Sequence, residues 1–179
     1  MVEKIFSEEA QWFLESVKKI NEDFSKQIGM LDVLVDREGK VVFMNNPAME
    51  ICKFVQKTKE GARRCGVCYK QAVDDFVSGK IKEPHFLNCH ANFAVMICPV
   101  LSKGEIVGAV IGCGGVFDEE SKQKAKQLLS QIEGLNEEMI ESVNVINPIS
   151  QTVLAQKGQR MTKLVGVLAE ETAFNEVLG

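Results

Sequence analysis

The chain has 179 residues, of which 45% are hydrophobic and 26% are charged, and its formal net charge is −4 at pH 7. This length and composition are typical of one globular domain and exclude a disordered chain, and the acidic balance argues against a nucleic-acid partner. No segment reaches the roughly 20 apolar residues that cross a bilayer, and the first residues do not resemble a secretory signal, so we expect a cytoplasmic protein without membrane contact.

The first part of the chain predicts a long helix followed by a β-hairpin. Ser7 suits an N-cap, Gly29 is expected to end the helix, and the apolar residues between them recur at helical spacing: Phe13, Val17, Ile20, Phe24 and Ile28. Two β-branched runs, 30–35 and 41–44, flank an Asp-to-Gly turn and predict a hairpin. Asn45-Asn46-Pro47 ends the second strand, and the proline is expected to open a short helix, 47–54.

The rest of the chain predicts a sheet of antiparallel strands and further helices. We interpret 56–64 as a charged loop that leads into a helix at 67–77. The later expected elements are strands at 86–89, 92–101 and 105–117 and helices at 118–132, 137–143 and 147–179. Ser102-Lys103-Gly104 is expected to form the hairpin turn between the last two strands, and Asp118 is expected to cap the helix that follows them. Consecutive hairpins favour an α+β fold in which helices cover one face of an antiparallel sheet.

Six cysteines carry most of the chemical promise of the sequence. Cytosolic thiols stay reduced, so we expect no disulfide framework. Four of them have a spacing that suits a metal, with two joined as a Cys-x-x-Cys pair: Cys52, Cys65, Cys68 and Cys89. Four thiolates can hold zinc or an iron–sulfur cluster, and His90 is a candidate substitute ligand. A structural zinc ribbon usually brings two Cys-x-x-Cys pairs and this chain has one, so the metal centre is one of several interpretations.

The other interpretations are redox chemistry and simple burial. The Cys65–Cys68 pair follows Arg63 and Arg64, which favour thiolate, so a dithiol oxidoreductase is an alternative. The pair does not lie in a βαβ pattern, and no paired acid and base accompany it, so we expect a binding domain rather than an enzyme. The two remaining cysteines lie in apolar strands and are expected to face the core: Cys98 and Cys113.

At these residues the sequence resembles a known family. The resemblance rests on the following segments in order: Ile51-Cys52, Arg64-Cys65, Asn88-Cys89-His90-Ala91, Ile97-Cys98-Pro99-Val100 and Ile106-Val107-Gly108-Ala109. This order is similar to that of PocR sensory domains, a PAS-like variant with an added cysteine set. The resemblance implies a PAS-like antiparallel sheet with flanking helices and long terminal helices. We expect one structural unit made of an N-terminal helix at 1–29, a sensory domain at 30–146 and a C-terminal helix at 147–179.

The resemblance also implies a function. PocR sensory domains are attached to transcription regulators, histidine kinases and chemotaxis-type receptors and are thought to bind small organic compounds. Asn92-Phe93 replaces the usual Gly-Leu near the expected pocket. Together with the matching cysteines and histidine, the residues that the resemblance implies for ligand binding are Cys52, Cys65, Cys89, His90, Asn92 and Phe93. We expect a small-molecule effector, sensed in a pocket or at a metal centre, to order the segment 56–68 and act on a downstream regulator or kinase.

A third hypothesis is an interaction module. The first and last helices are candidates for a homodimer interface, and Trp12 lies off the apolar stripe of the first helix. A sensor and a dimer are compatible interpretations. The identity of the ligand or metal, the output partner and the oligomeric state are not encoded in any motif that we find.

Overall fold

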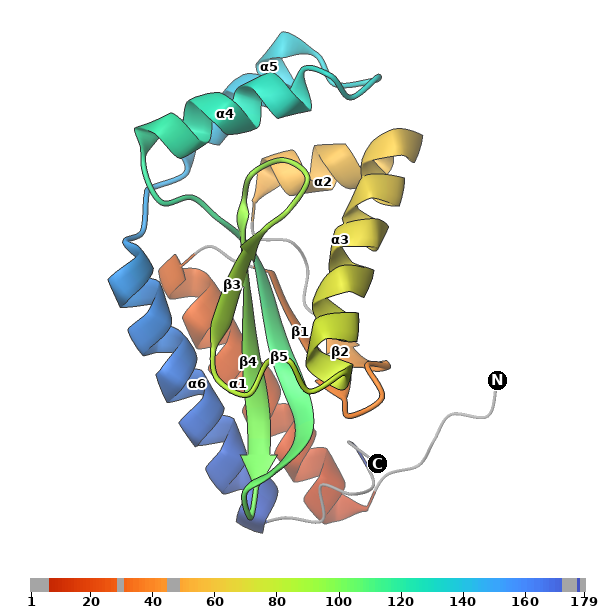
Figure 1. The fold of residues 1–179 in the computed structure, drawn as a ribbon, viewed down its shortest axis with the longest axis vertical. Helices are drawn as coiled ribbons and strands as arrows, with labels where there is room; N and C mark the ends of the chain where they lie inside the picture. The colour runs from red at the N-terminus through yellow and green to blue at the C-terminus, as the bar shows by residue number, and fades with distance from the viewer. Residues whose placement is uncertain (1–6, 29–30, 45–48, 172–176, 178–179) are drawn as a thin grey trace.

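A five-stranded antiparallel sheet forms the centre of the fold, in the order β2-β1-β5-β4-β3 (Figure 1). The computed structural model describes residues 7–28, 31–44, 49–171 and 177. The strands are β1 (Leu31–Asp36), β2 (Val41–Met44), β3 (His85–Asn88), β4 (Ala94–Ser102) and β5 (Glu105–Gly115). The helices are α1 (Glu8–Ile28), α2 (Glu50–Lys57), α3 (Lys59–Val77), α4 (Glu119–Leu129), α5 (Glu137–Glu141) and α6 (Gln151–Glu171), with a 3-10 turn η1 (Ser142–Val145).

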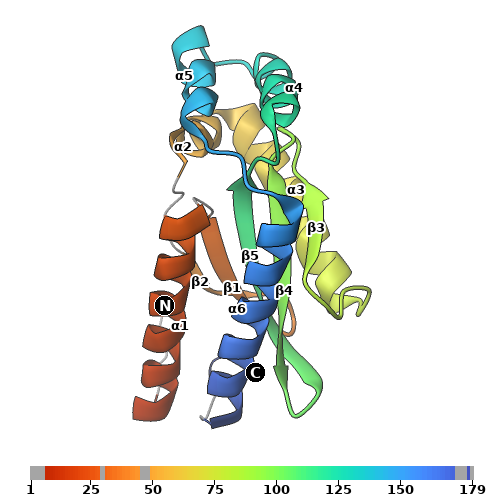
Figure 2. The same cartoon turned by 90° about the vertical axis from the view of Figure 1, so that its left-hand side faces the viewer.

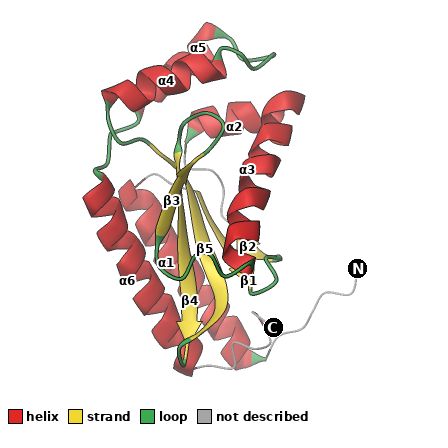
Figure 3. Cartoon of the chain, viewed as in Figure 1, coloured by secondary structure: helices red, strands yellow, loops and turns green. Residues whose placement is uncertain are grey.

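The predicted α+β, PAS-like class is confirmed, and Figure 3 shows the helices around the sheet. Ser7 caps α1 as predicted, because its hydroxyl accepts a hydrogen bond from the Ala10 amide at 3.2 Å. The β4–β5 turn is also as predicted, with Lys103 and Gly104 at φ 50° and 84°, the left-handed pair that a two-residue hairpin turn needs. The predictions at Gly29 and at Asn45-Asn46-Pro47 lie outside the described residues.

Helices cover both faces of the sheet, so the prediction of helices on one face is wrong. One face packs against α1 and α6, and we call it the packed face; its strand residues are Leu34, Ala94, Met96, Cys98, Val100 and Val110. The other face lies under α3, and we call it the cavity face; its strand residues are Val33, Val35, Val95, Ile97, Ala109, Ile111 and Cys113. The reason lies in β4, which is buried at eight of its nine positions, a pattern typical of a strand covered on both sides.

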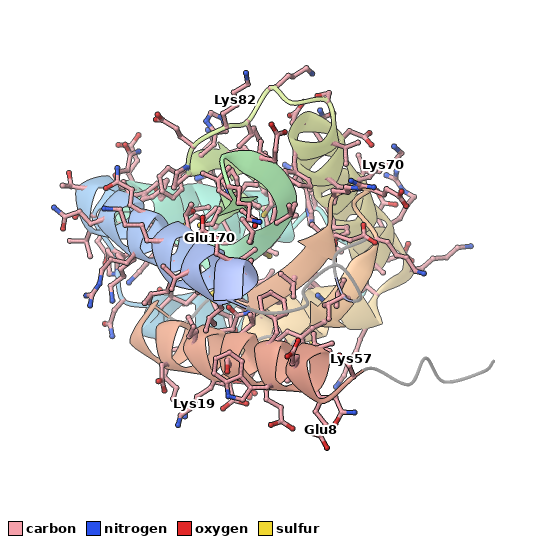
Figure 4. The ribbon with its side chains drawn as sticks, turned by 90° about the horizontal axis from the view of Figure 1, so that it is seen from below. Glu8, Lys19, Lys57, Lys70, Lys82 and Glu170 are labelled. Carbon is pink, nitrogen blue, oxygen red and sulfur yellow. The ribbon has the colours of Figure 1, made fainter. Side chains whose placement is uncertain are left out.

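The packed face is held by two long helices that lie side by side (Figure 2). Phe13 of α1 and Met161 of α6 are fully buried in its core. Gly166 lets α6 approach β4 closely, because a Cβ at this position would lie 2.9 Å from the Leu101 carbonyl oxygen. Glu170 of α6 accepts a hydrogen bond from the Lys103 amide at 3.2 Å, which ties the helix to the β4–β5 turn (Figure 4).

The predicted charged loop at 56–64 is instead the end of α2 and the first turns of α3. Thr58 breaks the two helices with extended backbone, and its side chain accepts a hydrogen bond from the Gly61 amide at 3.0 Å. Glu60 then pairs with Arg63 at 2.8 Å and with Arg64 at 2.7 Å, one turn further along. Lys, Glu and Arg are good helix formers, so a capped charged run is a helix start as readily as a solvated loop. The Cys-x-x-Cys pair therefore lies inside a helix.

The remaining helices form a cap at one end of the sheet (Figure 1). Asp118 caps α4 as predicted, accepting from the Ser121 amide at 2.6 Å. Helix α2 packs in one apolar cluster with α4 and η1, including Ile51, Leu129 and Val143. No helix among the described residues is both long enough and apolar enough to span a bilayer.

Candidate functional site

A cavity of about 440 Å³ lies between α2, α3 and the cavity face of the sheet. Its floor is formed by strand residues that include Val33, Val95 and Ile111, and its other walls come from the two helices and the segment 89–93. Gly66 of α3 leaves open space, since a Cβ there would meet nothing within 4 Å. None of the described lining residues is Asp, Glu, Lys or Arg.

Five cysteines line the cavity, and the four predicted from spacing are among them. Cys52 comes from α2, Cys65 and Cys68 lie one turn apart on α3, and Cys89 follows β3. The fifth is Cys113 on β5. None of the six cysteines, all of which are described, forms a disulfide. Elements far apart in the sequence thus bring five thiols to one apolar space.

His90 contacts the sulfur atoms of two cysteines on α3. Its Nε2 lies 3.3 Å from Cys65 Sγ, and its backbone amide donates to Cys68 Sγ at 3.2 Å. The segment that carries it is a tight turn, because the Cys89 amide donates to the Phe93 carbonyl at 2.8 Å. Asn92 completes the turn with a left-handed φ of 61°. The turn and the helix therefore fix the imidazole against one thiol.

Burial favours the uncharged form of three thiols and of the imidazole in the cavity. Desolvation raises the pKa of Cys65 to about 11, with a smaller contribution from Cys68. Desolvation also raises the pKa of Cys89 to about 11, although amides of neighbouring residues stabilise its thiolate. The pKa of Cys52 is raised well above its ordinary value by burial and by the other thiols. The pKa of His90 is lowered by desolvation and by Arg64, so the imidazole is neutral.

Two polar atoms on lining residues are buried without a hydrogen-bond partner in the described part of the chain. They are the hydroxyl oxygen of Tyr69 and Nδ1 of His90. Burial, with a smaller effect of Asp36, raises the pKa of Tyr69 to about 12, so the hydroxyl keeps its proton. An unsatisfied buried polar atom costs about 1–3 kcal/mol, so a polar atom that entered beside either group would gain a ready partner.

The structure separates the predicted ligand residues into two places. Cys52, Cys65, Cys89, His90 and Phe93 all line the cavity. Asn92 does not belong to that lining: its side chain accepts from the Asn88 side chain at 3.2 Å and donates to the Ser121 carbonyl at 3.4 Å. Asn92 thus links the 89–93 turn to α4 outside the cavity.

The predicted metal centre is not preformed around the four cysteines. Among the described residues, no three side chains of His, Cys, Asp or Glu are grouped so that they could hold one metal ion. A zinc or iron–sulfur centre would therefore need the thiols to move together, and it stays a prediction.

Two ionisable lining residues, Cys113 and Tyr69, were missed by sequence reasoning. Both Cys98 and Cys113 were assigned to the core, but only Cys98 lies in the packed face. In the β4–β5 pairing, Cys113 is opposite Val95, whereas Cys98 is opposite Val110. Since side chains alternate along a strand, the hairpin register was the signal that could have separated them.

One family model matches the chain. It is described as PocR, "Sensory domain found in PocR", and it matches residues 13–173, which include every described lining residue of the cavity. No curated protein and no solved structure matches the chain.

Proposed function

The chain belongs to the family of PocR sensory domains, as the sequence resemblance indicated, and we propose that it senses a small, neutral, mainly apolar organic compound bound in the cysteine-lined cavity. The sensing role rests on the family. The ligand class rests on one observation: the described lining carries no formal charge but holds two unpartnered polar atoms, on Tyr69 and His90. A ligand with an apolar body and one hydroxyl or carbonyl group matches this lining.

The energetics favour a neutral ligand over a charged one. Each methylene that leaves water for an apolar cavity gains about 0.8 kcal/mol, so a six-carbon chain gains about 5 kcal/mol, which corresponds to a Kd of roughly 0.3 mM. A carboxylate or ammonium group would lose its hydration with no opposite charge among the described lining residues. Six-carbon compounds that differ only in their head group therefore test the proposal.

Helix α2 offers a route from the cavity to the rest of the molecule. Cys52 and Val55 line the cavity, while Ile51 and Val55 also pack in the cluster that contains α4 and η1. A ligand that repositions α2 would shift the balance between two packings of this cap. This route replaces the expected ordering of the segment 56–68, whose residues other than Thr58 already lie in α2 and α3. A downstream regulator or kinase and a cytoplasmic location remain parts of the proposal.

The sequence left two alternatives, a dithiol oxidoreductase and a metal centre. A dithiol oxidoreductase needs a thiol whose pKa is lowered, and burial raises the pKa of Cys65 instead. A zinc or iron–sulfur centre at Cys52, Cys65, Cys68 and Cys89 would be stable if binding energy drew the thiols together. Elemental analysis and visible absorption of anaerobically purified protein decide this point, because a metal lost in Cys65→Ser would favour the metal centre.

The binding test compares hexan-1-ol with hexanoate and hexylammonium by thermal unfolding and calorimetry. We expect hexan-1-ol to bind and to raise the unfolding temperature, and the two charged compounds to do neither. Cys113→Leu places bulk in the cavity and should weaken hexan-1-ol binding at least severalfold. Val67→Leu, on the exposed side of α3, is the matched control and should bind as the natural chain does. Equal binding of all three compounds would contradict the proposal.

A further inference from the structure

The cavity holds a thiol and an imidazole in contact, and non-covalent binding of a neutral ligand does not require such a pair. Resting on the proposed function, we propose that Cys65 and His90 capture small neutral aldehydes reversibly, as a hemithioacetal on Cys65 Sγ. The aldehyde would be the effector, and the covalent bond would be the recognition step.

The geometry suits proton transfer between the two side chains. Cys65 Sγ lies 3.3 Å from Nε2 of His90, which is hydrogen-bonding distance for sulfur. The pair is held from both sides, because the His90 amide donates to Cys68 Sγ one helical turn along α3. Both groups belong to the lining of the cavity, so a bound ligand meets the sulfur directly.

Two neighbouring thiols of the cavity have other contacts. Cys89 Sγ accepts a hydrogen bond from the Ala91 amide at 3.4 Å, and Cys68 Sγ accepts from the His90 backbone amide rather than from its ring. The second histidine, His85, is an exposed residue of β3. The His90 ring is therefore placed to take the proton of Cys65.

The chemical step is an addition in which atoms and electrons balance. The Cys65 thiol passes its proton to Nε2 of His90 while Sγ attacks the carbonyl carbon and forms the S–C bond. The π pair of the C=O bond moves to the oxygen, which then takes the proton from Nε2. No leaving group, oxidant or reductant is needed, and the reverse step releases the aldehyde, as a sensor requires.

A second observation also points to a ligand at this pair. If Nε2 accepts the thiol proton, neutral His90 carries its own proton on Nδ1, and that atom is buried without a partner among the described residues. A second acceptor atom of the ligand, apart from the carbonyl oxygen, would satisfy it. The described lining carries no charged side chain, and an aldehyde is the simplest neutral compound that combines a carbon that a thiol attacks with an oxygen that can take the proton from Nε2.

The test follows [1-¹³C]hexanal on the reduced full chain by carbon-13 NMR. We expect a new signal from a tetrahedral carbon bonded to oxygen and sulfur. It should be absent from both Cys65→Ala and Cys65→Ser, so that misfolding of one variant cannot explain the loss. It should be present in Cys98→Ala, the thiol control, because Cys98 lies in the packed face and not in the cavity lining. In His90→Gln the adduct should form roughly 100-fold more slowly, since general base catalysis typically contributes at least this factor.

Two results would overturn the inference. One is a natural chain that shows no tetrahedral signal, or only the imine signal of lysines. The other is a tetrahedral signal that persists in both Cys65 variants. Hexan-1-ol separates this inference from the proposed function, because the alcohol cannot form the adduct. If hexan-1-ol binds and hexanal gives no adduct, the covalent step is wrong and the sensor cavity stands; if neither binds, both are wrong.

Discussion

The two faces of the sheet are built from alternate residues of the same strands, yet they differ in how completely they are covered. On the packed face, Phe13 and Met161 fill the space between the sheet and two helices. On the cavity face, one helix stands over Val33, Val95 and Ile111 and leaves about 440 Å³ beside them. The packed face supplies the buried apolar surface that stabilises the fold, which allows the cavity face to keep space for a ligand.

The two strand cysteines show the same contrast at single positions. Cys98 is fully buried in the packed face, and Cys113 lines the cavity three residues beyond Val110, the residue that pairs with Cys98. Both cysteines lie in apolar strands, so the face of the sheet, and not the residue type, decides what each thiol can do. The predictions below compare matched residues of the two faces.

The largest difference is expected between Phe13→Ala and Cys113→Ala. Removing the fully buried ring of Phe13 opens a cavity in the packed face and should lower the free energy of unfolding by about 3–5 kcal/mol. Removing the Cys113 sulfur enlarges an existing cavity and should cost about 1 kcal/mol or less. Urea unfolding of both variants measures this difference, and equal losses would refute the contrast between the faces.

A second comparison uses one glycine from each covering helix. Gly166→Ala on α6 would place a Cβ 2.9 Å from the Leu101 carbonyl oxygen, so it should destabilise the chain by about 1–3 kcal/mol despite the helix propensity of alanine. Gly66→Ala on α3 meets nothing within 4 Å and should stabilise it by up to about 1 kcal/mol. If both variants shifted the unfolding midpoint in the same direction, the result would contradict close packing at Gly166 of α6 and open space at Gly66 of α3.

A third prediction concerns pH, because the buried thiols lie on the cavity face. Cys65 and Cys89 hold their protons up to a pKa of about 11 in the folded chain, against 9.0 for an exposed thiol. Their contribution to stability is complete below pH 9 and is lost as pH rises toward 11. The free energy of unfolding should fall in this window by at most about 1.4 kcal/mol per pH unit for each thiol.

The control for this prediction is the double variant Cys65→Ala/Cys89→Ala, measured by urea unfolding at pH 8, 9 and 10 alongside the natural chain. It should lose less stability with rising pH, since two raised thiol pKa values are removed. An identical slope in the two proteins would mean that these thiols are not the groups that titrate.

The smallest expected effect is at the start of α3. Thr58→Ala removes the side-chain acceptor for the Gly61 amide and should cost about 1 kcal/mol. Amide exchange in the first turn of α3 should rise with it. Thr152→Ala, at an exposed position of α6, is the control and should change stability by less than about 0.5 kcal/mol. Unchanged exchange at 59–62 would contradict the capping role.

Much of the fold could be predicted because its signals are local. The N-cap at Ser7, the turn at Lys103-Gly104 and the cap at Asp118 act within a few residues. The start of α3 was missed because a capped charged run and a solvated loop have the same composition, and only the Thr58 side chain distinguishes them. The helix cover on the second face of the sheet was missed because the order of hairpins does not determine on which face of the sheet a helix packs.

The candidate site was predictable to the extent that its residues carry unusual chemistry. Cysteine spacing and the segment around His90 identified four of the five lining thiols and the imidazole. Cys113 was missed because the direction of its side chain depends on the strand register. Tyr69 was missed because its position depends on the full extent of α3. Asn92 was included because it neighbours the pocket in sequence, but its side chain bonds Asn88 and Ser121 instead.

The central claim is that ligand binds on the cavity face and not on the packed face, and methyl NMR during a hexan-1-ol titration tests it most directly. We predict saturable shifts at the methyl groups of Val33, Val95 and Ile111, which line the cavity. The methyl groups of Leu34, Met96 and Val110, on the same strands but in the packed face, should stay unchanged. Shifts confined to the second set, or no saturable shift in either, would contradict the account.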